Sequence, residues 1–164
     1  GNDHYMWGYI YLCLLAGIVI AVDQGTKLLV RSELSVGESW MPWEVISDYA
    51  VVVHTWNTGM TFGILKGTNG LFIALSEILC ILILILYPSF IRHRDIRLVG
   101  LGLGLILGGA VGNLIDRLVV GYVTDIFLVN FLPVFNLADI AIFLGAAILA
   151  FSLIFGERDE SVSE

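Results

Sequence analysis

Four apolar runs, each about as long as a lipid bilayer is thick, constrain this chain more than any other feature. They lie at about residues 6–30, 71–90, 98–115 and 135–155. A helix needs roughly 20 apolar residues to cross the hydrocarbon layer. Charged residues make up only 14% of the 164 residues, which is too little charge to cover a soluble domain of this size. We therefore predict an all-α membrane protein, with four transmembrane helices bundled in a single domain over residues 1–164.

The orientation of the bundle follows from the basic residues in its short links. Arg92, Arg94 and Arg97 lie between the second and third runs, and the positive-inside rule places this link in the cytoplasm. Both termini, including a polar tail at 156–164, are then cytoplasmic, and the loops at 31–70 and 117–134 lie on the outer side. The first run lacks a basic leading segment and a small-x-small cleavage site, so we expect it to be retained as a span.

The outer loop at 31–70 contains structure signals of its own. Ser47 to Trp56 is rich in β-branched and aromatic residues, which favours one or two short strands at the membrane interface. Trp40 and Trp43 are suited to the headgroup region. Asn57 to Gly59 is a turn signal, and Met60 to Leu65 is predicted to form a short interfacial helix.

A stripe of small residues runs along the third apolar segment. Gly100, Gly104, Gly108 and Gly112 recur every four residues, so they share one helix face. Such a stripe lets a neighbouring backbone approach closely within lipid. Asp116 continues the same face, so the closely packed seam leads to an acid. Taken alone, the stripe also fits a non-catalytic assembly protein that uses it to dimerise.

Carboxylates are the side chains left to carry chemistry. The chain has no His and Cys cluster with metal-ligand spacing, and no Ser or Cys beside a plausible base. Cys13 and Cys80 lie inside apolar runs and are interpreted as small buried hydrophobes. We therefore expect neither a metal nor a cofactor. Eight Lys and Arg residues spread along the chain make no basic patch, which argues against a nucleic-acid partner.

Two acids, Asp125 and Asp139, have the placement that acid and base chemistry requires. Asp125 follows the third run and Asp139 lies about one turn into the fourth, so packing of these helices would bring both to one depth. Neighbouring carboxylates titrate as a pair and supply a base for water and an acid for a leaving amine. Spacing alone leaves open that each is a solvated residue at a helix end. Asn136, at i, i+3 to Asp139, could orient this acid, bind a substrate carbonyl or cap the helix.

Two pairs of opposite charge stand near the ends of the first and third runs. Asp23 and Lys27 are spaced i, i+4 and are expected to form an ion pair on one helix face. Asp116 and Arg117 are adjacent, and a second structural ion pair is expected there.

Glu77 supports an alternative function. It lies about seven residues into the second run, with no charged residue near it in sequence. If Glu77 faced a water path through the bundle, the chain would be a small proton-coupled membrane transporter that uses this acid as a relay.

Five ordered motifs together carry a resemblance to a known family. They are Asp23-Gln24-Gly25-Thr26-Lys27, Asn57-Thr58-Gly59-Met60-Thr61-Phe62-Gly63, the block from Gly108 to Arg117, Val123-Thr124-Asp125, and Phe135-Asn136-Leu137-Ala138-Asp139. On a four-span plan, this order resembles the lipoprotein signal peptidase family, the bacterial signal peptidase II family of membrane aspartic peptidases.

The resemblance implies a function and a site. Asp125 and Asp139 would be the catalytic pair of an intramembrane endopeptidase that cleaves diacylglyceryl-modified prolipoproteins before the lipidated cysteine. It implies a small β-cradle resting on the membrane, an active site near the outer face of the bacterial inner membrane, and inhibition by globomycin-type cyclic peptides. We expect a monomer whose partners are lipidated signal peptides and membrane lipid. The residues implied to line or brace the substrate site are Asp23, Lys27, Asn57, Gly59, Asn113, Asp116, Arg117 and Asn136.

Overall fold

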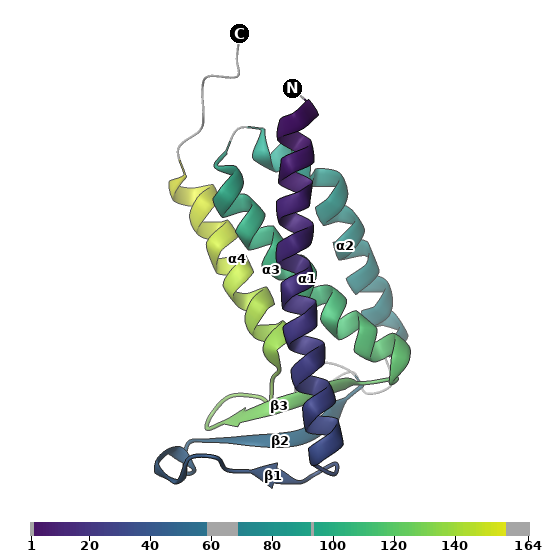
Figure 1. Ribbon diagram of the computed structural model, residues 1–164, viewed down its shortest axis with the longest axis vertical. Coiled ribbons are helices and arrows are strands. Elements are labelled where there is room, and N and C mark those ends of the chain that lie inside the picture. The colour runs from purple at the N-terminus through teal and green to yellow at the C-terminus, as the bar shows by residue number, and fades with distance from the viewer. Residues whose placement is uncertain (1, 59–68, 93, 157–164) are drawn as a thin grey trace.

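Four long helices form the body of the protein (Figure 1). The computed structural model describes residues 2–58, 69–92 and 94–156. The helices are α1 (Asn2–Glu33), α2 (Asn69–Ile91), α3 (Ile96–Val119) and α4 (Leu137–Phe155). All four are long and apolar enough to cross a membrane, so the predicted four-span architecture is confirmed. The first three helices extend beyond their expected ranges at both ends, and α4 begins two residues after the expected position 135 because Asn136 caps it.

Helix α3 is the centre of the bundle. In its most apolar stretch 67% of the residues are buried, against 17%, 11% and 22% for α1, α2 and α4. The glycine stripe from Gly100 to Gly112 packs against α1 as a close seam. A Cβ atom on any of its four glycines would lie 2.5 to 2.9 Å from an atom of α1. The stripe is therefore filled by a helix of the same chain, and the hypothesis that it serves dimerisation is wrong.

A three-stranded antiparallel sheet lies across one end of the bundle (Figure 1). Its strands are β1 (Ser39–Trp40), β2 (Ala50–Asn57) and β3 (Val123–Val129), with a short 3-10 helix, η1 (Glu44–Ile46), between the first two. Strand β2 confirms the expected strand at 47–56. Strand β3 was not predicted, since 117–134 was expected to be a loop. It pairs with β2 so that Thr55 lies opposite Asp125, which places this acid on a strand.

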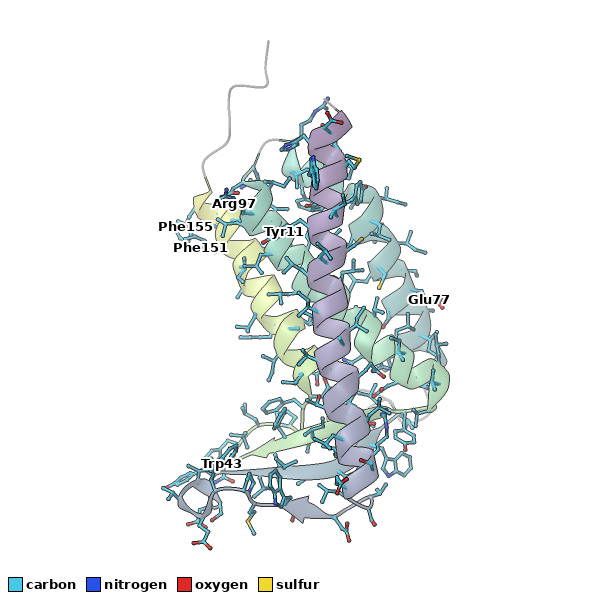
Figure 2. The ribbon with its side chains drawn as sticks, viewed as in Figure 1. Tyr11, Trp43, Glu77, Arg97, Phe151 and Phe155 are labelled. Carbon is cyan, nitrogen blue, oxygen red and sulfur yellow. The ribbon has the colours of Figure 1, made fainter. Side chains whose placement is uncertain are left out.

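The two ends of the bundle differ in character. The sheet lies where α1 ends and α4 begins, whereas the start of α1, the link from α2 to α3 and the end of α4 gather at the other end (Figure 1). Arg97 and Phe155 lie at that second end, far from Trp43 in the connection between β1 and β2 (Figure 2). The arginine-rich link and the sheet are thus at opposite ends, as the predicted topology requires. That the sheet end is the outer side stays a prediction.

Two further expectations concern α2 and its approach. Glu77 is exposed on α2, on the side turned away from the other helices (Figure 2). It faces no path through the bundle, so the transporter hypothesis loses the residue on which it depended. Gly59 and the short helix expected at Met60 to Leu65 lie outside the described residues, as does nearly all of the polar tail at 156–164.

Candidate active site

A pocket of about 640 Å³ opens where the sheet meets α2, α3 and α4. Asp125 from β3 and Asp139 from the first turn of α4 both line it, as do Asn57, Asn113 and Arg117. Helices α3 and α4 pack side by side, and the two acids line the same pocket, Asp125 from β3 and Asp139 from α4. Much of the remaining wall is apolar and includes Phe72, Leu132, Pro133, Phe135, Phe143 and Leu144.

Asp139 is held by the cap of its own helix. Asn136 is the N-cap of α4, and its side-chain oxygen accepts a hydrogen bond from the Asp139 N–H at 3.0 Å. In return, Asp139 Oδ2 accepts the Asn136 N–H at 3.1 Å, which completes a capping box. Asn113 on α3 donates from Nδ2 to Asp139 Oδ1 at 3.0 Å. The carboxylate is therefore fixed from two sides at the edge of the pocket.

Asn136 connects the two acids. Its Nδ2 lies 3.2 Å from Asp125 Oδ1, 3.0 Å from Asn113 Oδ1 and 3.2 Å from the Thr124 carbonyl oxygen. The capping role and the orienting role proposed for Asn136 are thus both present in one fully buried side chain. The third possibility, contact with a substrate carbonyl, stays a prediction, and the Asn136 side chain has no exposed surface here.

The charge state of Asp125 is set by its surroundings. The residue is only 6% exposed. Burial, followed by repulsion from Asp139, raises the pKa of Asp125 from 3.8 to about 7. The positive charge of Lys27 and hydrogen bonds from Asn136 and Asn57 act in the opposite direction. Asp125 therefore exchanges its proton near neutral pH, in the range where a general acid is most effective.

A fully buried ionic network lies beneath the pocket. The Lys27 ammonium contacts Asp23 Oδ2 at 2.8 Å, Asp116 Oδ2 at 3.1 Å and Asn113 Oδ1 at 3.0 Å. The predicted Asp23–Lys27 pair is confirmed, and it reaches further than expected. Asp23 Oδ1 also accepts the backbone N–H of Ala138 at the start of α4. Because Asn113 Oδ1 faces Lys27, its Nδ2 is directed toward Asp139.

Asp116 belongs to this network and does not pair with its neighbour in sequence. Arg31 approaches Asp116 Oδ1 at 3.4 Å, and the Gln24 amide donates to the same oxygen at 3.0 Å. The expected Asp116–Arg117 pair is wrong, because adjacent residues on a helix point in different directions. Arg117 instead lies over the Phe72 ring, 5.2 Å from its centroid, at the pocket wall.

Sequence reasoning missed three residues of the site: Gln24, Arg31 and Thr124. A signal for Arg31 exists, since Asp23, Lys27 and Arg31 follow one another at intervals of four residues on one face of α1. Gln24 and Thr124 stand in quoted motifs, but neither was assigned to the site, because the partners that reveal their roles are distant in sequence: Gln24 donates to Asp116 on α3, 92 residues away, and Thr124 accepts from Arg31 on α1, 93 residues away.

The expected site residues therefore divide into two groups. Asn57, Asn113 and Arg117 line the pocket and can reach a bound molecule. The second group has no exposed surface, and its side chains contact the pocket residues or one another. This second group consists of Asp23, Lys27, Asp116 and Asn136.

The fold has close counterparts among solved structures. Two solved structures of bacterial membrane enzymes superpose with TM-scores of 0.76 and 0.75, at 28% and 27% sequence identity. The first alignment covers 87% of both chains, and the second covers 88% of this chain and 92% of the other. The fold and the site thus define a four-helix membrane protein whose pocket brings together two carboxylates.

Sequence comparison identifies the family. The family model for signal peptidase (SPase) II matches residues 15–155. A lipoprotein signal peptidase of Halothermothrix orenii is 43% identical over 85% of this chain and 91% of its own length. One from Moorella thermoacetica is 40% identical over 86% and 91%, and one from Serratia marcescens is 35% identical over 93% and 90%. The chain belongs to the signal peptidase II family, a family of peptidases that process lipoprotein signal peptides.

Proposed function

We propose that this peptidase is an intramembrane aspartic endopeptidase that cleaves diacylglyceryl-modified prolipoproteins before the lipidated cysteine. The observation that carries the proposal is the pair Asp125 and Asp139, which lines one pocket from two different elements. The two acids have different environments, and both are bonded to Asn136. Paired carboxylates in unlike environments can divide the roles of acid and base between them.

Asp139 acts as the base in this proposal. Its carboxylate accepts hydrogen bonds from Asn113 and from the Asn136 backbone, which hold both of its oxygens in place at the pocket. Asp139 takes a proton from a water molecule, and the water oxygen bonds to the carbon of the scissile carbonyl.

Asp125 acts as the acid. Its pKa of about 7 leaves much of it protonated at neutral pH. It gives its proton to the carbonyl oxygen as water adds, which forms a neutral tetrahedral diol. When the C–N bond breaks, Asp139 transfers its proton to the leaving amine nitrogen, and Asp125 recovers a proton from a diol hydroxyl. Both acids return to their starting states.

The character of the pocket wall supports a lipid-modified substrate. Phe143 lines the pocket and is also 74% exposed on the outer surface of the bundle. The pocket is therefore continuous with the surface that the helices turn toward lipid. A signal peptide can enter sideways in this arrangement, while the acyl chains on its cysteine stay in the bilayer and the scissile bond reaches the carboxylates.

The setting proposed for the enzyme follows the predicted topology. The bacterial inner membrane is the location, with both termini in the cytoplasm and the pocket near the outer face. The separation of the arginine-rich link from the sheet supports this orientation. A monomer is supported by the glycine stripe, which is used within the chain. A globomycin-type cyclic peptide is expected to compete with substrate for the pocket.

The test is cleavage of a diacylglyceryl-modified prolipoprotein by purified enzyme, with mass analysis of the released signal peptide. Asp125→Asn and Asp139→Asn should each lower turnover by about 10²-fold to 10⁴-fold or more, while the helical content is kept. Asp48→Asn is the matched control, because Asp48 is an exposed carboxylate on a sheet loop, and its turnover should equal that of the wild type.

Three results would contradict the proposal in different ways. If either of the two pocket variants retains turnover, the two acids are not the catalytic pair. If a substrate without the diacylglyceryl group is cleaved equally well, the enzyme does not require the lipid. If the product mass places the cut away from the cysteine, the proposed cleavage site is wrong.

A further inference from the structure

Thr124 connects strand β3 to the helix bundle through three hydrogen bonds, which together are called the Thr124 fastening. Its backbone N–H donates to Asp116 Oδ2 on α3 at 2.9 Å. Its hydroxyl accepts a hydrogen bond from Arg31 Nη1 on α1 at 2.8 Å. Its carbonyl oxygen accepts from Asn136, the cap of α4, at 3.2 Å. One residue, with no exposed surface, thus uses all three of its polar groups to contact three different helices or their ends.

The position of this fastening matters because Thr124 precedes Asp125. Consecutive Cα atoms are about 3.8 Å apart, so a shift of Thr124 is passed directly to the acid. Successive side chains of a strand point to opposite faces. The Thr124 hydroxyl is accordingly held from the side of α1, while the Asp125 carboxylate is directed into the pocket.

The two acids depend on this fastening unequally. Asp139 is part of a transmembrane helix and is fixed by its own capping box. Asp125 lies on a sheet at the end of the bundle, so its distance from Asp139 depends on where β3 is held. Arg31 is suited to hold it, because its guanidinium also contacts the fully buried Asp116, which receives the Thr124 N–H. A single guanidinium thereby connects two of the three contacts that hold the strand, the one at the Thr124 hydroxyl and the one through Asp116.

We infer that Arg31 and Thr124 are positioning residues that set the Asp125 carboxylate against Asp139. The inference rests on the proposed function, since it assigns these residues to the placement of one member of the dyad. Neither residue lines the pocket, so they act on the reaction through Asp125 and not through contact with the substrate.

The test uses substitutions that remove the bond with little change in shape. Thr124→Val deletes the hydroxyl and keeps a β-branched residue, and Arg31→Met deletes the guanidinium. Each should lower kcat about tenfold or more, because a misplacement of about 1 Å can cost about 10²-fold, while KM for the lipidated substrate stays unchanged. Thr124→Ser keeps a hydroxyl and should recover most of kcat. Thr26→Val is the matched control, because the Thr26 hydroxyl bonds only within α1, to Val22 and Asp23 carbonyls.

The double variant separates positioning from general damage. If both residues serve one bond, combining Thr124→Val with Arg31→Met should cost no more than the larger single loss. Losses that multiply, a rise in KM in place of a fall in kcat, or wild-type kcat in either single variant would overturn the inference. If Thr124→Val does not fold, Arg31→Met carries the same test, since its side chain is 17% exposed.

The outcome is distinguishable from a failure of the proposed function. When Asp125→Asn and Asp139→Asn abolish turnover but Arg31→Met does not affect kcat, only the positioning inference falls. When either Asn variant retains turnover, the dyad itself is wrong.

Discussion

Replacing Lys27 by methionine tests whether the buried ionic network holds the site together. Lys27 has no exposed surface, and its three ammonium hydrogens have three partners within 3.1 Å. Lys27 and Arg31 balance the charges of Asp23 and Asp116. Lys27→Met leaves the group with one net negative charge, on the fully buried Asp23 and Asp116 side chains. Removing one partner of a buried ion pair costs about 3–5 kcal/mol, so we expect a loss of this size in the free energy of unfolding.

The assay is reversible unfolding in detergent micelles, followed by circular dichroism across a denaturant series. Lys27→Met should also lower turnover, because Asn113 Oδ1 loses one of its two donors and no longer directs Nδ2 to Asp139. Adding Asp23→Asn restores a net charge of zero and should recover part of the lost stability. A loss below about 1 kcal/mol in the single variant, or a double variant as unstable as the sum of both changes, would refute this reasoning.

Three further outcomes follow from the same structure. Gly108→Ala should lower the free energy of unfolding by about 1–3 kcal/mol or more, since the added Cβ would lie 2.6 to 3.0 Å from atoms of α1, including backbone atoms. Gly17→Ala is the control: its Cβ would meet open space, so it should be neutral or stabilising in the same unfolding assay. Because the pKa of Asp125 is raised, this residue contributes stability that is fully present below about pH 4 and is lost as pH rises to about 7. Asp125→Asn should therefore flatten this part of the stability–pH curve and be more stable than wild type at pH 8. An unchanged curve would contradict the raised pKa of Asp125. Glu77→Gln should leave peptide cleavage at the wild-type rate, because Glu77 lies on the outer side of α2, and a large loss of turnover would show that it has a role at the site.

The helices and their seam could be predicted from sequence because both signals are local. Each span needs only a long apolar run, and the glycine stripe is a simple period of four residues. Strand β3 could not be recognised in the same way. It is a seven-residue segment between two spans, and its partner β2 lies about 70 residues earlier in the chain. Its β-branched and aromatic residues are a weak signal until that pairing is known.

The two acids and some of their supports, such as Asn136 and the Asp23–Lys27 pair, could be found from sequence, but most of the contacts between helices could not. Asp125 and Asp139 stand out because carboxylates are rare beside apolar spans. The contacts that organise them join residues on different helices, such as Lys27 to Asn113 and Arg31 to Thr124. Adjacency in sequence misled the assignment of Asp116, which bonds to residues of α1 about 85 to 92 positions away.

The division of the ionic network between α1 and α3 bears on how the protein is inserted. Asp23 and Lys27 lie one turn apart on one helix, so they can neutralise each other as soon as α1 is made. Asp116 is synthesised about 90 residues later, after α2, when its cationic partners Lys27 and Arg31 are already present on α1. We therefore expect α1 to enter the bilayer with its Asp23–Lys27 pair already neutralised, whereas Asp116 gains the contacts with Lys27 and Arg31 only when α3 packs against α1.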